Sequence, residues 1–158
     1  MSYLLGIDLG TSSVKSLIID TEGHIISVGQ EDYDFDIPQI GYAENDPMVW
    51  WNATKNTIRT ALAKGKIIPS EIKGIGFSGQ MHGLVAVDKN GQVVRKGIIW
   101  ADQRSSEQIN FVKEKIGLEK FSKVTLNAPA TGFMLLSLLW VKDNEPENYR
   151  KINKVMMP

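Results

Sequence analysis

Residues 3–20 read Tyr3-Leu-Leu-Gly-Ile-Asp8, then Leu9-Gly-Thr-Ser-Ser13, then Val14-Lys-Ser-Leu-Ile-Ile-Asp20. The first and third pieces are short apolar runs typical of buried strands, and the middle piece is a turn of small and hydroxyl residues. The run His24–Gln30 follows another turn and predicts a third strand. Three strands joined by short turns predict an antiparallel meander.

Helical spacing begins after Asp46-Pro47, which is typical of an N-cap followed by proline at the first helical position. Apolar residues recur there to about Lys64, and of Trp50 and Trp51 one indole is expected in the core and the other half-exposed. The remaining sequence predicts a strand at 72–77, a hairpin of 84–87 with 92–94, a strand at 98–100, a helix from a Ser105–Gln108 capping box to about 116, a helix at 133–141, and the start of a strand at 154–157. Leading strands and following helices predict an α/β layer architecture with a mixed sheet.

The composition is that of an ordinary globular protein of about one domain, with 158 residues, 42% of them apolar. The chain has 18 basic residues (Lys and Arg) and 18 acidic residues (Asp and Glu), so its net charge is zero. This balance gives no electrostatic indication of binding to nucleic acid or to an anionic membrane. The chain has no cysteine, which excludes thiol chemistry, and only two histidines, which leaves few ligands for a histidine-rich metal centre. With no secretory signal and no apolar run of ~20 residues, the sequence predicts a soluble cytoplasmic protein with no membrane partner.

The first candidate site is the turn between the first two strands. Its candidate residues are Asp8, Gly10, Thr11, Ser12, Ser13 and Lys15. Glycine lets the backbone approach a ligand, hydroxyl and amide groups donate to phosphate oxygens, and Lys15 adds a positive charge. Asp8 can hold Mg²⁺ directly or through water. The alternative interpretation is an ordinary hairpin turn, and the Gly-Lys-Ser/Thr ending of a Walker A loop is missing.

Two further candidates lie in the second half of the chain. Gln80 and His82, within Ser78-Gly-Gln-Met-His-Gly83, can both donate and accept hydrogen bonds, which suits a ligand rich in hydroxyls. The alternative there is a solvated polar loop. The segment Trp100-Ala-Asp-Gln-Arg104 places an aromatic residue and a candidate bidentate Asp102–Arg104 pair at a strand-to-helix junction. The alternative is a surface ion pair of little energetic value.

Taken together, these segments resemble the FGGY carbohydrate kinases, and the resemblance covers essentially the whole chain. The segments that carry it are Gly6-Ile-Asp-Leu-Gly-Thr-Ser-Ser-Val-Lys15, Glu44-Asn-Asp-Pro47 with Trp50-Trp51, Gly76-Phe-Ser-Gly-Gln-Met-His-Gly-Leu-Val85, Trp100-Ala-Asp-Gln-Arg104 and Leu139-Trp-Val-Lys142. The Ser78–Gly83 stretch is the most specific of them and resembles the xylulokinases within that family.

The resemblance implies a ribonuclease H-like N-terminal lobe of the actin, chaperone and sugar-kinase superfamily. It also implies transfer of the ATP γ-phosphoryl group, with Mg²⁺, to D-xylulose. By motif, Asp8 would position Mg²⁺ and phosphates, and the other residues of the first turn would line the phosphate site. The expected sugar-site residues are Gln80, Met81, His82, Trp100, Asp102 and Arg104. The alternatives are a kinase for gluconate or ribulose, and a non-catalytic sugar- or nucleotide-binding module.

The family's general base is an aspartate well downstream, so the resemblance implies that it lies beyond Pro158 and that Asp8 is not the base. Residues 1–158 are then expected to form an incomplete N-terminal kinase domain without the second lobe, and with negligible kinase activity alone. The apolar ending Val155-Met-Met-Pro158 is interpreted as a cut edge. A cut edge predicts exposed apolar surface and self-association, for example as a homodimer.

Overall fold

A computed structural model describes all residues 1–158, and these form two compact units. Unit 1 consists of Met1–Asp34 and Met48–Gln80, and unit 2 consists of Phe35–Pro47 and Met81–Pro158. The segment Phe35–Pro47 therefore belongs to unit 2, although it lies between the two segments of unit 1 in the sequence.

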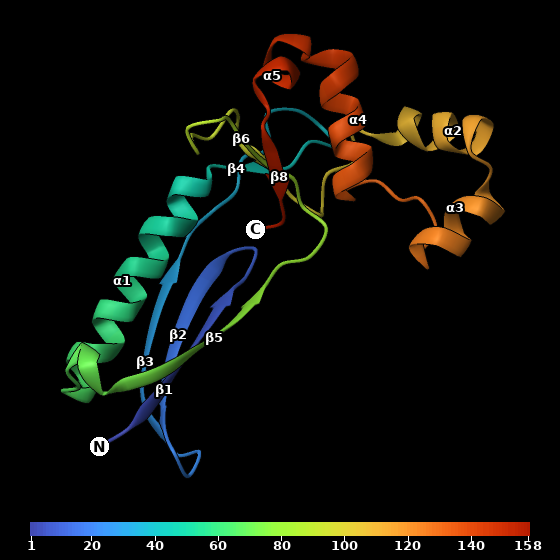
Figure 1. The fold of residues 1–158 in the computed structure, drawn as a ribbon. Coiled ribbons are helices and arrows are strands. Elements are labelled where there is room, and N and C mark those ends of the chain that lie inside the picture. Colours follow the sequence, from blue (N-terminus) through green and yellow to red (C-terminus); the bar gives the residue numbers. More distant parts are fainter. The chain divides into compact units, whose positions relative to one another are not determined.

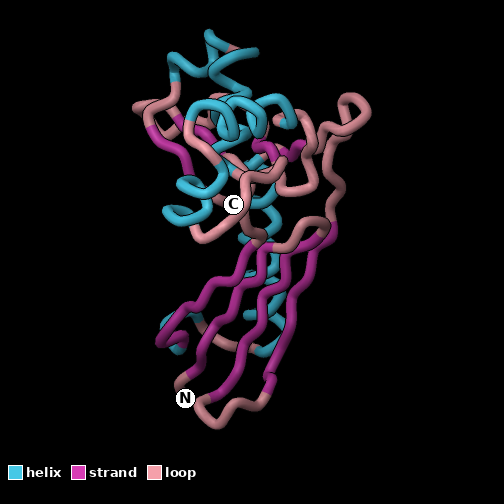
Figure 2. The backbone as a smooth tube through the Cα atoms, turned by 90° about the vertical axis from the view of Figure 1, so that its right-hand side faces the viewer, coloured by secondary structure: helices cyan, strands magenta, loops and turns pink.

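Unit 1 contains a four-stranded sheet in the order β3-β2-β1-β5. Its strands are β1 (Tyr3–Leu9), β2 (Ser13–Asp20), β3 (Ile25–Asp32) and β5 (Ile72–Gly79), and Figure 2 shows them running side by side. β2 pairs antiparallel with both β1 and β3, whereas β5 pairs parallel with β1. The predicted meander and the predicted mixed sheet are both confirmed.

One face of this sheet packs against α1 (Pro47–Gly65), which begins at the predicted proline and leads through a short 3₁₀ turn, η1 (Pro69–Glu71), into β5 (Figure 1). Alternate strand residues point toward the helix because side chains alternate between faces of a strand. The buried apolar core is formed by Leu5, Ile7, Val14, Ile18, Ala53, Ala61 and Ile67. Of the tryptophan pair, Trp50 is 4% exposed and Trp51 is 58% exposed, as predicted.

Small and hydroxyl residues allow the helix to lie close to the sheet. The hydroxyls of Ser16 and Thr57 are 2.8 Å apart in a buried hydrogen bond, and Ser27 Oγ donates to the carbonyl of Ala61 at 2.8 Å. Glycine is required at position 29, because a Cβ there would lie 2.1 Å from the Thr57 carbonyl oxygen. These polar groups are satisfied across the interface, so their burial carries no penalty for unpaired groups.

Unit 2 is built from two strand pairs and four helices. β4 (Glu44–Asn45) pairs with β7 (Gly97–Ile98), and β6 (Val85–Val87) pairs with β8 (Lys154–Met156), both antiparallel. The helices are α2 (Ser106–Lys115), α3 (Leu118–Thr125), α4 (Met134–Asn144) and α5 (Pro146–Lys151). The apolar side of α4 is buried in two small cores, one around Leu84, Ile98 and Val141 and one around Val112, Phe121 and Leu136.

Of three predictions in unit 2, one is confirmed and two require correction. The 84–87/92–94 hairpin forms: the Asp88 amide donates to the Gln92 carbonyl and the Val94 amide to the Ala86 carbonyl, both at 2.9 Å, around an antiparallel Val87–Val93 bridge. What the prediction lacked is that β6 also pairs with β8. The capping box is wrong: Ser105 is the N-cap, but its hydroxyl makes no capping bond, and the Gln108 amide donates to Asp143 at 3.0 Å instead. The strand predicted at 98–100 is shorter, since β7 ends at Ile98.

Candidate functional site

The first candidate site lies on the sheet of unit 1. The strand register there places two predicted site residues in one row with a third polar residue. Asp8 of β1 lies opposite Lys15 of β2 on one side and Ser78 of β5 on the other. All three residues are exposed. They line a concavity of about 340 Å³ with Gly6 and Gly76, which face each other across β1 and β5. Because neither glycine has a side chain, a ligand can approach the strand backbone there.

The turn after β1 is held by hydrogen bonds to its own backbone. The Gly10 amide donates to the Ser13 carbonyl at 2.9 Å, and the Tyr33 hydroxyl donates to the Gly10 carbonyl at 2.6 Å. The Gln80 amide nitrogen also donates to that carbonyl, at 3.4 Å, and the Gln80 backbone donates to Leu9 at 2.9 Å. Gln80 therefore lies with the predicted phosphate turn in unit 1. Its Oε1 atom is buried without a partner, which leaves an acceptor for a ligand donor.

Tyr33 was not singled out by the sequence, yet it fixes this turn. Burial, with a smaller contribution from the negative charge of Asp8, raises the pKa of Tyr33 to about 12. A folded-state pKa above the unfolded value of about 10 means that the stabilisation is complete below pH 10 and is lost as the pH rises toward 12.

Replacing Tyr33 with phenylalanine is expected to lower the free energy of unfolding by about 1 kcal/mol at pH 8, because the bond to Gly10 is lost. The difference between the two proteins should shrink between pH 10 and 12, where only the wild type loses the contribution of the Tyr33 hydroxyl. Tyr33 is partly exposed, so the slope should stay below about 1.4 kcal/mol per pH unit. Urea unfolding across this pH range measures the free energy of unfolding of both proteins. A difference that stays constant with pH would contradict the raised pKa of Tyr33.

The second group of predicted residues lies in unit 2. Met81 is 67% exposed, and His82 follows it in a three-residue turn in which the Gly83 amide donates to the Met81 carbonyl at 2.9 Å. At the centre of this turn His82 has a φ of 71°, in the left-handed region. Its imidazole stacks on the Phe133 ring with the centroids 4.0 Å apart and the planes at 9°.

Trp100 is half-exposed and lies against the segment that precedes α4. Gly132 has a φ of 76°, and a Cβ on it would lie 2.1 Å from the Trp100 carbonyl oxygen. The backbone of Gly132 thus contacts Trp100, and the next side chain, Phe133, contacts His82. The sequence analysis missed both residues. The only local signal was a glycine directly before a predicted helix, which on its own indicates no more than a turn.

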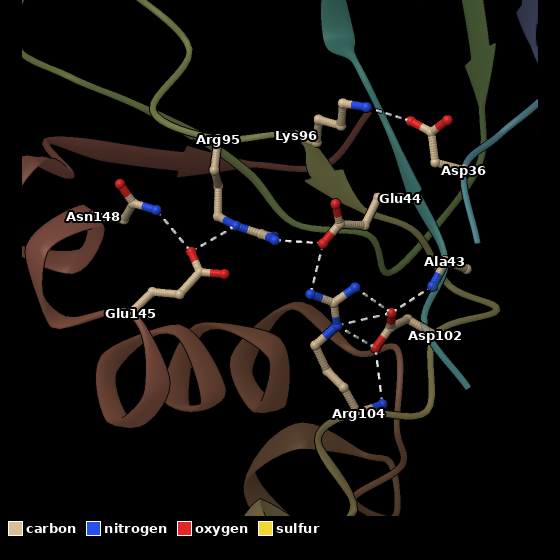
Figure 3. Close-up of polar contacts among 9 residues, drawn as sticks. All are labelled: Asp36, Ala43, Glu44, Arg95, Lys96, Asp102, Arg104, Glu145 and Asn148. Carbon is tan, nitrogen blue, oxygen red and sulfur yellow. Dashed lines mark hydrogen bonds and ion pairs between the residues drawn. The ribbon is translucent and has the colours of Figure 1, made fainter. Parts of the chain in front are cut away.

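The predicted Asp102–Arg104 pair forms, and it is buried rather than on the surface. Arg104 Nε lies 3.0 and 2.9 Å from the two carboxylate oxygens of Asp102, and the two side chains are 1% and 0% exposed. Figure 3 shows that Glu44 lies between two arginines: its Oε1 accepts from Arg104 at 2.6 Å and from Arg95 at 2.5 Å. Arg95 also donates to Glu145 at 2.9 Å. Five buried or half-buried charges therefore tie together β4, the β7 region and the start of α5.

The guanidinium of Arg104 is also enclosed by aromatic rings. Its central carbon lies 3.9 Å from the centroid of Tyr42 and 4.9 Å from that of Trp140. Burial lowers the pKa of Arg104, but the hydrogen bonds and charges of Asp102 and Glu44 outweigh it, so the net shift is upward. The charge is therefore permanent, and its contacts in this structure are to the protein itself. The Ala43 amide also donates to Asp102 Oδ2 at 2.7 Å, which helps to fix the loop around Trp100.

The sheet with its hydroxyl-rich turn in unit 1, and the loop group in unit 2, hold the residues that the resemblance to carbohydrate kinases singled out. Comparison with known families gives the same class: the profile described as the FGGY family of carbohydrate kinases, N-terminal domain, matches residues 3–158. The chain belongs to the FGGY family. None of its helices has the length and apolar character needed to cross a membrane.

Individual relatives agree with this assignment. The chain is 37% identical over its whole length to a xylulose kinase from Staphylococcus xylosus and to one from Lactococcus lactis, of which it covers 32% and 31%. The crystal structure of a "xyloylose kinase" from Brucella ovis superposes with a TM-score of 0.91 at 35% identity, covering 99% of this chain and 32% of that one. The chain thus spans about a third of these relatives, and the predicted sugar-kinase fold is confirmed.

Proposed function

We propose that this chain forms the N-terminal part of an enzyme that transfers the γ-phosphoryl group of ATP to D-xylulose, giving D-xylulose 5-phosphate. The observation that carries the proposal is the row of Lys15, Asp8 and Ser78 along a glycine-floored concavity beside a hydroxyl-rich turn. Phosphoryl transfer depends on positioning and charge neutralisation more than on covalent chemistry, and this row supplies both signs of charge. The xylulose kinases that match the whole chain support the choice of sugar.

The residues of the first site fit MgATP. The Asp8 carboxylate is exposed in the concavity, and oxygen ligands of this kind suit Mg²⁺, directly or through water. Bound Mg²⁺ would neutralise charge on the phosphate oxygens. Lys15 would attract the phosphates, and the Gly10–Ser13 turn with Thr11 and Ser12 would offer amide and hydroxyl donors. Gln80 Nε2 donates to the Gly10 carbonyl, and its unpartnered Oε1 would accept a hydrogen bond from a bound hydroxyl or water.

The second group supplies contacts for a sugar. His82 can donate and accept hydrogen bonds at its ring edge, Met81 exposes an apolar side chain, and the half-exposed Trp100 offers a face for the C–H groups of a sugar. In this proposal Asp102 and Arg104 support the loop that carries Trp100, through their buried pair. We assign no general base to these 158 residues. The proposal places that aspartate in the two thirds of the relatives that the chain does not span.

The test is a chimera in which residues 1–158 replace the matching third of the Staphylococcus xylosus xylulose kinase. The chimera is expected to phosphorylate D-xylulose, and Asp8→Asn is expected to reduce kcat by about 10²-fold, because the carboxylate that orients Mg²⁺ and phosphate is lost. Glu114→Gln, an exposed change on α2, is the matched control and should leave kcat unchanged. A coupled ADP-release assay measures both.

Two results would contradict the proposal in different ways. A chimera that phosphorylates gluconate or ribulose but not D-xylulose would overturn the choice of sugar. Full activity of the Asp8→Asn chimera would overturn the assignment of the phosphate site while leaving the kinase activity in place.

A further inference from the structure

His82 is held in a backbone conformation that its residue type disfavours. A φ of 71° at the centre of a three-residue turn is the strained form of that turn, and it persists only where the surroundings fix it. Gly83 next to it leaves little room for a side chain, since a Cβ there would lie 3.0 Å from the Ile98 carbonyl oxygen. The backbone therefore fixes the direction of the Cα–Cβ bond of His82, but it leaves the side-chain torsion angles, and so the orientation of the imidazole ring, undetermined.

The ring orientation is set by Phe133. The two rings are nearly parallel, at 9°, with centroids 4.0 Å apart. Phe133 is the N-cap residue of α4. Its position follows from Gly132, whose backbone lies against the Trp100 carbonyl. One short segment thus contacts two residues of the proposed sugar site, one through its backbone and one through an aromatic face.

Space beside the stack makes the aromatic contact necessary. A cavity of about 210 Å³ adjoins it, and its lining includes His82, Phe121, Phe133, Met134, Leu136 and Met157. An imidazole released from the stack has room to rotate into this largely apolar space. Its ring nitrogens would then no longer be available to a bound ligand. An aliphatic side chain at position 133 offers no flat surface to prevent that rotation.

We propose that Phe133 is a positioning residue for sugar binding. It acts by holding the plane of the His82 imidazole parallel to its own ring, so that the imidazole nitrogens meet the sugar hydroxyls. The inference rests on the proposed function, in which His82 contacts D-xylulose. Aromatic stacking restricts the ring plane while leaving the hydrogen-bonding edge free. The residue forms no bond to the sugar in this scheme, so its effect is expected in KM for the sugar rather than in KM for ATP.

The kinetic test uses the chimera described above. Phe133→Leu is expected to raise KM for D-xylulose about tenfold, the upper range for a lost aromatic pair, with KM for ATP unchanged. Phe133→Tyr keeps the ring and should retain the wild-type KM. Phe111→Leu, which shortens a half-exposed phenylalanine on α2, is the matched control. Should the leucine variant fail to fold, Phe133→Met keeps the buried volume without a flat ring and is expected to show the same rise.

A spectroscopic test of the stack needs no activity and uses the 158-residue chain. The Phe133 ring current should shift the carbon-bound ring protons of His82 upfield, and Phe133→Leu should abolish that shift. The chain has one other histidine, the exposed His24, which serves as an internal reference. Unchanged His82 shifts, or an unchanged KM for D-xylulose in an active chimera, would overturn the inference. A chimera inactive on D-xylulose with the expected proton shifts would overturn the proposed function instead and leave the stack established.

Discussion

Replacing Arg104 with methionine is expected to lower the free energy of unfolding of unit 2 by about 3–5 kcal/mol, because it leaves buried carboxylates without a partner. The Asp102 carboxylate is 0% exposed, accepts hydrogen bonds from Arg104 Nε, and forms an ion pair with Arg104 Nη2 at 2.8 Å. Glu44 loses its 2.6 Å bond to the same guanidinium. A methionine fills much of the volume between Tyr42 and Trp140, so the loss should come from the unpaired charge rather than from a cavity.

Backbone amide exchange measures this effect within unit 2. The Ile98 amide donates to Leu84 at 3.0 Å and the Leu84 amide donates to Ile98 at 2.7 Å, so both report opening of the core beside the network. Lys96→Met is the matched control, because the Lys96–Asp36 pair has both side chains more than half exposed and should contribute about 1 kcal/mol or less. Equal effects of the two substitutions would contradict the interpretation of the buried network.

Replacing Gly132 with alanine is expected to destabilise unit 2 by about 2–5 kcal/mol, the sum of left-handed backbone strain and steric overlap. The added Cβ would lie 2.1 Å from the Trp100 carbonyl oxygen and 2.7 Å from its carbon. Because those atoms are backbone, they cannot move aside without displacing the loop that carries Trp100. The expected result is therefore both a loss of stability and a displaced Trp100.

Gly91→Ala is the matched control for this prediction. Gly91 has a φ of 77°, almost the value of Gly132, but nothing lies within 4 Å of its added Cβ. It should lose only the strain of about 1–2 kcal/mol. Amide exchange at Leu84 and Ile98 compares the two variants. If both cost the same, the close contact of Gly132 with Trp100 would not be the cause.

The sequence predicted the elements whose signals are local. The β1–β2–β3 meander follows from apolar runs separated by two short turns, and α1 follows from Asp46-Pro47 and its helical spacing. The hairpin after β6 also follows from a local turn signal. The pairing of β6 with β8 could not be predicted in this way, because the two strands are far apart in the sequence. Likewise, Gln108 fitted a local capping box, but the structure gives its amide a tertiary partner, Asp143.

In the candidate site, too, the residues with local sequence signals could be predicted and the contacts between distant segments could not. Asp8 and Lys15 are predicted together, since a tight turn between antiparallel strands places them opposite each other. The Asp102–Arg104 pair was predicted from its spacing, but its burial was not, because burial depends on Glu44, Tyr42 and Trp140 from other parts of the chain. Phe133 gave no signal as a site residue, since its partner His82 lies in a different loop and a single aromatic residue at a helix start is ordinary.

The chain passes between the two units three times, after Asp34, after Pro47 and after Gln80. During synthesis from the N-terminus, unit 1 has all its residues once Gln80 has been made. Glu44 by then is already made, but it lacks both of its arginines, and Glu145 comes later still. Domains generally fold as units, with the N-terminal one first. Unit 1 can therefore fold while the Phe35–Pro47 segment is still a loop whose partners in unit 2 have not been made. The ion network of unit 2 can thus form only after unit 1 has all its residues.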